Sequence, residues 1–265
     1  MSILDENDPD LTFKTEAEAK AFSSFFLQAH PYESQYEFET EIEYNDFLIR
    51  RERSLLAQLD HFHDIDFNKP NTISVKEKYY KIVPERHTIP QSSEGSIKKS
   101  SRFNYKDEEI LQNNVVYYGK TQRCCEIEKF HLEYQLDLIK KQENEAERDD
   151  LDILFTPIEK NIVYEYDIDI DKILVLTSKP SCDAISVKLG TYRNEWYEIN
   201  DQYEIPSSSQ ILGSIVKAKG YSGIMYTSIR QQTTPNLVIF EENTGKLTFK
   251  EIARKDLILS KNYLQ

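Results

Sequence analysis

The chain has 265 residues with a formal net charge of −13 at pH 7, and 39% of its residues are hydrophobic. This length suits one large domain, or one domain of ordinary size with an appendage. The acidic composition argues against non-specific nucleic-acid binding, which needs basic surface to displace counterions. No apolar run approaches the roughly 18 residues that would span a bilayer, so neither a nucleic acid nor a membrane is expected as a partner.

The N-terminal quarter of the chain is predicted to be helical. Residues 1–12 read as an acidic, disordered lead-in without the basic-then-apolar pattern of a secretory leader. Thr15 and Glu18 have the spacing of a helix capping box, and a second helical pattern covers 41–59. Residues 1–74 are therefore predicted to form an N-terminal helical extension. It is either a brace packed on the main domain or a partner-binding cap.

From about residue 75 short strands alternate with helices, which predicts an α+β fold for a main domain at 75–265. Strands are expected at 75–83, 113–118, 153–158, 161–168, 172–177, 223–229 and 236–240, and another in 246–259. Helices are expected at 122–147 and 207–219, the second one stopped by Gly220. The stretch around Trp196 is expected to be irregular.

The cysteines and histidines predict neither disulfides nor a metal site. Three cysteines, of which Cys124 and Cys125 are adjacent, make no disulfide framework and fit a reducing cytoplasm. The adjacent pair also lacks the C-x-x-C separation of metal ligands, and His61 and His63 form a pair with no third ligand nearby. The sequence therefore predicts a cytoplasmic protein without a bound metal.

Two features near residue 100 are candidates for ligand binding. Arg102 stands at the end of a polar loop, 87–101, where a guanidinium can pair with a phosphate through two hydrogen bonds. It could equally be a solvated surface cation. Tyr117 and Tyr118 end an apolar strand, so their side chains point to opposite faces. The inward one either stacks on a ligand ring or packs in the core.

The candidate catalytic groups are a carboxylate and a serine. Glu126 and Glu128 are two residues apart on a predicted helix and face different directions, so only one can share a cleft with Arg102. A carboxylate there can stabilise an oxocarbenium-like ribose centre or bind a ribose hydroxyl, or it is a solvated glutamate. Ser228 follows an apolar strand without a G-x-S-x-G elbow or a histidine partner. A ligand hydrogen bond is therefore favoured over a nucleophile.

In their order and spacing, these residues resemble the RES-domain family of bacterial toxins, named for its arginine, glutamate and serine. The resemblance covers roughly 75–255 and rests on the segments SRFN (101–104), VVY (115–117), CEIE (125–128), GIMYTSIR (223–230) and NLVIF (236–240). The family places its glutamate eleven residues after its tyrosine, and Glu128 follows Tyr117 by that number. This register selects Tyr117 over Tyr118 and Glu128 over Glu126.

The resemblance implies an ADP-ribosyltransferase-like mixed β core with flanking helices, to which the N-terminal helical extension is added. It implies NAD as the substrate, without a metal, and a separate antitoxin protein as partner; a homodimer is left open. The first hypothesis is an NAD-consuming toxin that cleaves the nicotinamide–ribose bond by hydrolysis or phosphorolysis. The alternatives are an ADP-ribosyltransferase acting on a protein, and a non-catalytic module that binds a nucleotide or a partner.

The resemblance also assigns roles to the candidate residues. Glu128 would stabilise the developing ribosyl cation, Tyr117 would pack against the nicotinamide-ribose side, and Ser228 would hydrogen-bond near the nicotinamide. Arg102 and Arg230 would hold the pyrophosphate.

Lys81 would hold the pyrophosphate with these arginines. It stands where the family usually has an arginine in its first strand, which keeps the charge but loses the planar fork.

Overall fold

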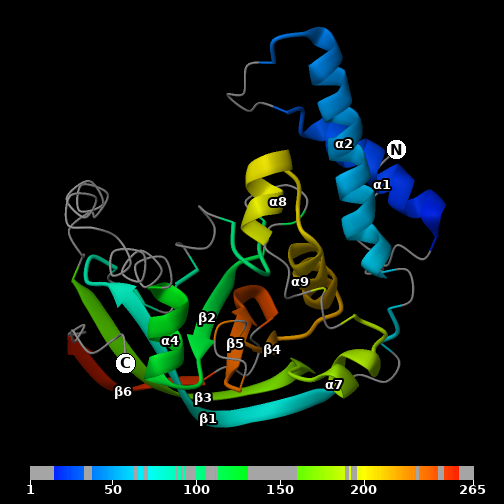
Figure 1. Ribbon diagram of the computed structural model, residues 1–265. Helices are drawn as coiled ribbons and strands as arrows, with labels where there is room; N and C mark the ends of the chain where they lie inside the picture. The colour runs from blue at the N-terminus through cyan, green and yellow to red at the C-terminus, as the bar shows by residue number, and fades with distance from the viewer. Residues whose placement is uncertain are drawn as a thin grey trace.

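The structure of the protein, a computed structural model, describes residues 15–32, 38–62, 65–67, 71–87, 89–90, 92–93, 100–105, 111, 113–130, 160–188, 191, 196–228, 230, 233–243 and 248–256. Its strands are β1 (Thr72–Pro84), β2 (Val115–Gly119), β3 (Asn161–Leu176), β4 (Gly223–Thr227), β5 (Pro235–Phe240) and β6 (Thr248–Asp256). Its α-helices are α1 (Glu16–Ala29), α2 (Glu41–Leu59), α4 (Gln122–Lys129), α7 (Lys179–Asp183), α8 (Trp196–Tyr203) and α9 (Ser208–Ala218) (Figure 1).

The described strands form one mixed sheet of six strands in the order β1-β2-β5-β4-β3-β6. Only the β3–β4 pair is parallel among these pairings. β1 also pairs with β3 along almost its whole length, so the sheet curls back on itself. Along β3, the neighbour opposite β1 is β6 at Ile162–Asp169 and β4 from Ile173 onward.

The alternation of side chains along the strands produces two large hydrophobic clusters, one on each face of the sheet, beside a small third cluster around Phe130. On β2, Val115 and Tyr117 pack toward the helices, whereas Val116 and Tyr118 join the cluster on the other face. The second cluster consists of side chains from the strands themselves. Tyr117 therefore faces the layer where α8 and α9 lie.

Helix α9 is the buried helix of the main domain. It begins at the N-cap Ser207, whose backbone N–H donates to the Gln210 side chain. It ends before Gly220, whose φ of 76° lies in the left-handed region that glycine adopts without strain. The Tyr221 N–H then donates to the carbonyl of Val216, which closes the last turn. The apolar side of α9 packs on the sheet and fixes the loop that contains Arg102.

Helices α1 and α2 pack together and share the core of the main domain. Both begin with a complete capping box, formed by Thr15 with Glu18 and by Thr40 with Glu43. Their buried apolar side chains belong to the same cluster as residues of α9 and the strands, and they include Phe22, Phe26, Leu55 and Leu59. None of the helices in the described part of the chain is long and apolar enough to cross a membrane.

The predicted fold class is confirmed: the chain has an α+β fold in which helices flank a mixed sheet, and a helical extension precedes the sheet. The predicted division at residue 74 stays a prediction. The helix expected at 122–147 ends at Lys129, with Phe130 as its C-cap, so its predicted continuation past 130 was wrong at that point. The rest of that pattern and the strand expected at 153–158 lie outside the described residues.

Two other sequence predictions about elements were wrong. The strands expected at 161–168 and 172–177 are one strand of 16 residues, β3. The chain does not turn at the polar pair Asp171-Lys172. At this pair the strand beside β3 changes from β6 to β4, and Lys172 has a φ of 57°. The stretch around Trp196, expected to be irregular, contains α8, and α7 precedes it.

Candidate active site

A cavity of about 860 Å³ opens between β1, β2, α4, α8 and the loop at 100–102. Its size is within the range of about 300–1,000 Å³ that is typical of small-molecule sites. The predicted residues that line it are Lys81, Arg102, Tyr117, Glu128 and Arg230. The remaining predicted residue, Ser228, lies behind the cavity wall and contacts Glu128. The structure thus brings together residues that span almost 150 positions of the sequence.

Glu128 is the carboxylate of this cavity. It lies on α4, whose first turn is capped by Thr121. Its Oε1 accepts hydrogen bonds from the Ser228 hydroxyl at 2.6 Å and from Asn236 Nδ2 at 3.1 Å. Its Oε2 lies 3.9 Å from Arg230 Nε. One carboxylate oxygen is therefore fixed from behind, while the side chain keeps 34% of its surface exposed.

The other candidate glutamate, Glu126, is buried and does not line the cavity. It accepts a hydrogen bond from Gln122 at 2.6 Å and lies 3.8 Å from Arg123. The structure therefore places the two glutamates as the register of the family pattern predicts, with Glu128 alone on the cavity side. Its chemical role stays a prediction.

Asn236 is a site residue that the sequence prediction did not assign. It lies on β5, lines the cavity, and is almost fully buried. The Cys124 thiol donates to its Oδ1 at 3.1 Å, which orients the amide so that Nδ2 faces Glu128. The sequence did contain an indication of this role. Asn236 is the first residue of the apolar segment NLVIF, where a polar side chain contributes little to core packing.

Arg102 is presented by a tight turn in which Ser101 and Asn104 form an isolated β-bridge. The Tyr117 hydroxyl accepts a hydrogen bond from the Phe103 N–H at 2.9 Å and is 3.0 Å from the Ser101 hydroxyl. Tyr117 therefore has two roles: its ring lines the cavity, and its hydroxyl fixes the turn that contains Arg102. Burial raises the pKa of Tyr117 to about 12, so this hydroxyl stays protonated.

Helix α9 holds the same turn from the other side. Gln210 Nε2 donates to the carbonyls of Ser101 and Asn104 at 3.0 and 3.2 Å. Gly213 allows the close approach, because a Cβ at this position would lie 2.4 Å from the Phe103 carbonyl oxygen. The turn is thus fixed by hydrogen bonds on both sides, which sets the backbone position from which the Arg102 side chain extends.

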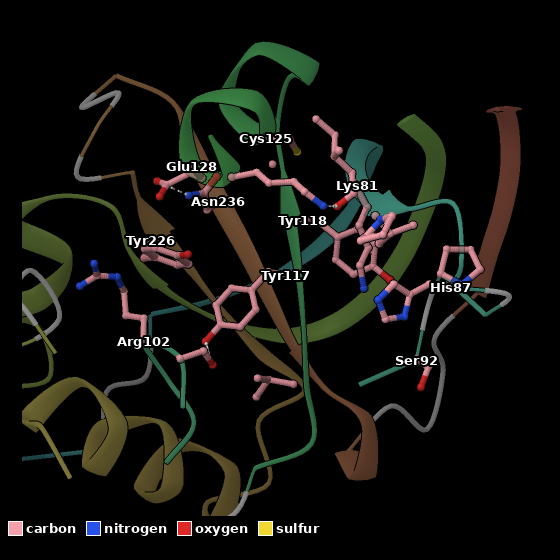
Figure 2. A pocket seen from close by; sticks show the side chains of 18 of the residues that line it. Lys81, His87, Ser92, Arg102, Tyr117, Tyr118, Cys125, Glu128, Tyr226 and Asn236 are labelled. Atoms are coloured by element: carbon pink, nitrogen blue, oxygen red, sulfur yellow. Dashed lines mark hydrogen bonds between the residues drawn. The ribbon is translucent and has the colours of Figure 1, made fainter. Parts of the chain in front are cut away.

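Tyr226 is a second unassigned site residue. It lines the cavity on β4, and its ring packs edge-on against Phe103 with centroids 4.9 Å apart. Figure 2 shows Tyr226 between Arg102 and Glu128. Burial, together with the nearby Glu128 carboxylate, raises its pKa well above the ordinary value, and Arg102 opposes this shift. Tyr226 is therefore a neutral aromatic wall between the cation and the carboxylate.

Lys81 lies on β1, away from Arg102; Figure 2 shows the two cations on opposite sides of Tyr117. Its ammonium is 5.6 Å from the centre of the Tyr118 ring. Burial lowers the pKa of Lys81 to about 7, while Glu241 and Cys125 raise it and Lys129 lowers it further. Lys81 thus lines the cavity as predicted, but it carries a full positive charge only below neutral pH.

The last predicted cation, Arg230, turns toward the carboxylate. Its backbone N–H donates to the Ser228 hydroxyl at 3.2 Å, and its side chain approaches Glu128. Within the part of the chain that the structure describes, no group of three or more His, Cys, Asp or Glu side chains could hold a metal ion. The cavity thus offers one carboxylate held in place, two guanidinium groups and aromatic walls.

Comparisons with known proteins leave the chain without a family assignment. No protein-family model matches the chain, and no curated protein sequence matches it. Among solved structures, the chain is similar to one in the crystal structure of the M. tuberculosis MbcT–MbcA toxin–antitoxin complex, with a TM-score of 0.48 and 14% sequence identity, covering 70% of this chain and 86% of that chain. Because the TM-score and the sequence identity are low, this likeness assigns neither a family nor an activity.

Proposed function

We propose that the chain is an NAD-consuming enzyme that breaks the nicotinamide–ribose N-glycosidic bond and acts as a toxin by depleting NAD. The observation that carries the proposal is the position of Glu128. Its carboxylate lies at the wall of the cavity, fixed by Ser228 and Asn236, with Arg102 across Tyr226. A fixed anion facing a cavity that also holds a guanidinium matches a substrate with a developing ribosyl cation and a phosphate.

The bond that breaks joins C1′ of the ribose to the pyridinium nitrogen. Its electron pair goes to that nitrogen, so nicotinamide leaves as a neutral molecule and positive charge develops on the ribose. The Glu128 carboxylate stabilises that charge, and it does so without reorganising because Ser228 and Asn236 already hold it. An acceptor then adds to C1′; water gives ADP-ribose and releases a proton.

The phosphate end of the substrate needs cations at a distance from the carboxylate. Arg102 supplies a guanidinium from a turn held on both sides by Tyr117 and Gln210, and such a group pairs with phosphate oxygens through two hydrogen bonds. Arg230 serves Glu128 more directly, because their side chains approach each other. We therefore assign the pyrophosphate to Arg102 first, with Lys81 as a cation farther along the cavity.

The role as a toxin and the antitoxin partner belong to the same proposal, and both rest on the resemblance of the motifs to the RES-domain family. A partner that neutralises the enzyme would act by covering the cavity of about 860 Å³ that Glu128 lines.

The test is the release of nicotinamide from NAD by the purified chain, with Glu128→Gln beside Glu126→Gln as the matched control. Glu128→Gln keeps the size of the side chain and removes the charge. It is expected to lower release at least ~100-fold, equivalent to roughly 3 kcal/mol of transition-state stabilisation. Glu126→Gln, two residues away and outside the cavity, is expected to stay within about threefold, since it removes no group that faces the substrate.

Two results would contradict the proposal: no release by the unsubstituted chain, or an equal loss in both variants. Isotope-labelled NAD supplied with phosphate identifies the acceptor in the same assay. ADP-ribose indicates water, a phosphorylated ADP-ribose indicates phosphate, and label on protein indicates ADP-ribosyl transfer.

A further inference from the structure

Helix α8 contributes two adjacent aromatic side chains to the cavity, and neither is needed by the chemistry above. Trp196 and Tyr197 both line the cavity, with ring centroids 6.0 Å apart and ring planes at 90°. Tyr197 is 47% exposed, and none of the residues of α8 is fully buried. Ile199 and Tyr203 of α8 pack against the main hydrophobic cluster, whereas Trp196 and Tyr197 face the cavity.

A buried polar group also holds α8. Arg51 of α2 is 2% exposed, and it donates from Nε to the Tyr203 carbonyl at 2.8 Å and from Nη2 to the Glu204 carbonyl at 3.2 Å. These carbonyls are at the C-terminal end of α8, where a cation also complements the helix dipole. The same guanidinium binds the His30 carbonyl at the end of α1, at 2.9 Å. The N-terminal extension thus clamps α8 over the cavity.

A second set of bonds fixes α8 relative to Arg102. Asn200 of α8 exchanges two side-chain hydrogen bonds with Gln210, at 2.9 and 2.8 Å. Gln210 in turn holds the carbonyls of Ser101 and Asn104, on either side of Arg102. The buried Gln210 therefore contacts both α8 and the turn of Arg102, and it fixes the two relative to each other.

We propose that Trp196 and Tyr197 form a base-binding wall, on which the adenine ring of the substrate stacks. The identity of the base rests on the proposed function: with the reacting ribose at Glu128 and the pyrophosphate at Arg102, the other end of a dinucleotide continues toward α8. Figure 1 shows α8 at one end of β2 and α4 beside that strand, so the cavity spans both. A flat, uncharged base can stack on one of these aromatic faces and meet the other ring edge-on, because the two ring planes stand at 90°.

The chain contains a single tryptophan, so its fluorescence reports on this wall without any turnover. Titration with AMP, which carries the adenine and one phosphate, is expected to change the emission of Trp196 in a saturable way. Tyr197→Ala should weaken AMP binding about 10-fold or more, the loss typical for removing a stacking aromatic. Tyr44→Ala, at an exposed tyrosine of α2 that does not line the cavity, is the matched control and should bind AMP as the unsubstituted chain does.

A second readout compares two substrates, NAD and nicotinamide mononucleotide, of which only NAD carries an adenine. In Tyr197→Ala, the ratio of kcat/KM for NAD to that for the mononucleotide should fall about 10-fold. The proposed base-binding wall is contradicted if AMP up to millimolar concentration leaves the Trp196 emission unchanged, or if Tyr197→Ala leaves the ratio of the two kcat/KM values unaffected. If the chain releases no nicotinamide at all, the proposed function fails, whereas AMP binding that depends on Tyr197 still supports the wall.

Discussion

The Ser228 hydroxyl donates to Glu128 Oε1 at 2.6 Å, although the two residues are 100 positions apart in the chain. Ser228 is fully buried, so it holds the carboxylate from behind and does not line the cavity. The sequence assigned this serine to the ligand. Its position instead indicates a positioning residue that acts through Glu128, and hydrogen bonds of this length to an ionised carboxylate are among the stronger ones in proteins.

Ser228→Ala should therefore lower kcat for nicotinamide release by about 10-fold or more and leave KM nearly unchanged. The reason is that a hydrogen bond to a charged group contributes about 1.5–3 kcal/mol, and here it fixes a group that acts in the transition state. The control is Ser222→Ala, since Ser222 is also buried but donates to the Asn243 carbonyl outside the cavity. A rise in KM at constant kcat would show instead that Ser228 binds the substrate.

Tyr117→Phe tests whether the turn of Arg102 depends on the hydroxyl beneath it. The substitution keeps the ring in the cavity wall and leaves the Phe103 N–H without its acceptor. An unsatisfied buried donor costs about 1–3 kcal/mol, and the freed turn should bind ADP-ribose about 5- to 10-fold more weakly. Binding is measured by isothermal titration calorimetry and unfolding by urea. Tyr166→Phe, at a buried tyrosine of β3 that does not line the cavity, serves as control; an equal loss there would refute a specific role of Tyr117.

Local patterns were sufficient to predict much of this molecule. The capping box of Thr15, and the stop at Gly220, depend on residues within one or two turns of each other. The choice of Glu128 over Glu126 came instead from the resemblance to the RES-domain family, whose eleven-residue spacing after the tyrosine is present here, and Glu128 does line the cavity. Periodicity and spacing report such short-range geometry directly.

The missed features depend on contacts between distant segments. Gln210 meets the carbonyl of Ser101 across 109 residues, and Arg51 meets Tyr203 across 152. The sequence around Gln210 in the apolar helix α9, or around Arg51 in the charged helix α2, does not indicate such distant partners. Helix α8 was missed for the same reason, because a clamp from elsewhere in the chain holds it and its own pattern is not apolar enough.

The unusual environment of Lys81 predicts a pH dependence of ligand binding. With a pKa of about 7, its ammonium is mostly charged at pH 6 and mostly neutral at pH 8. An anionic ligand binds the charged form better, so the Kd for ADP-ribose should rise as the pH rises through 7. One coupled proton limits this rise to about tenfold per pH unit.

Lys81→Arg separates this effect from other titrations, because a guanidinium stays charged across the whole range. The variant should bind ADP-ribose with a Kd that is nearly constant between pH 6 and 8, measured by calorimetry in buffers of equal ionic strength. Lys81→Met should also be insensitive to pH, at the weaker affinity that the unsubstituted chain reaches at pH 8. A pH profile that survives in both variants would mean that another group titrates.

The clamp on α8 predicts that one residue of the N-terminal extension matters for both stability and binding. Arg51→Met fills much of the same volume but removes donors to the carbonyls of His30, Tyr203 and Glu204. Leaving these buried carbonyls unpaired should lower the free energy of unfolding by about 3 kcal/mol, since hydrogen bonds from charged groups contribute about 1.5–3 kcal/mol each and losses in one network do not add fully.

The control for this prediction is Arg53→Ala, because Arg53 is exposed on the same helix and its loss should stay within about 0.5 kcal/mol. Arg51→Lys should rescue little, since an ammonium cannot reach three carbonyls that a planar fork spans. Urea unfolding gives the stabilities, and AMP titration of the folded variant tests the clamp itself. If Arg51→Met lowers stability but leaves AMP affinity unchanged, the arginine braces the fold without positioning α8 over the cavity.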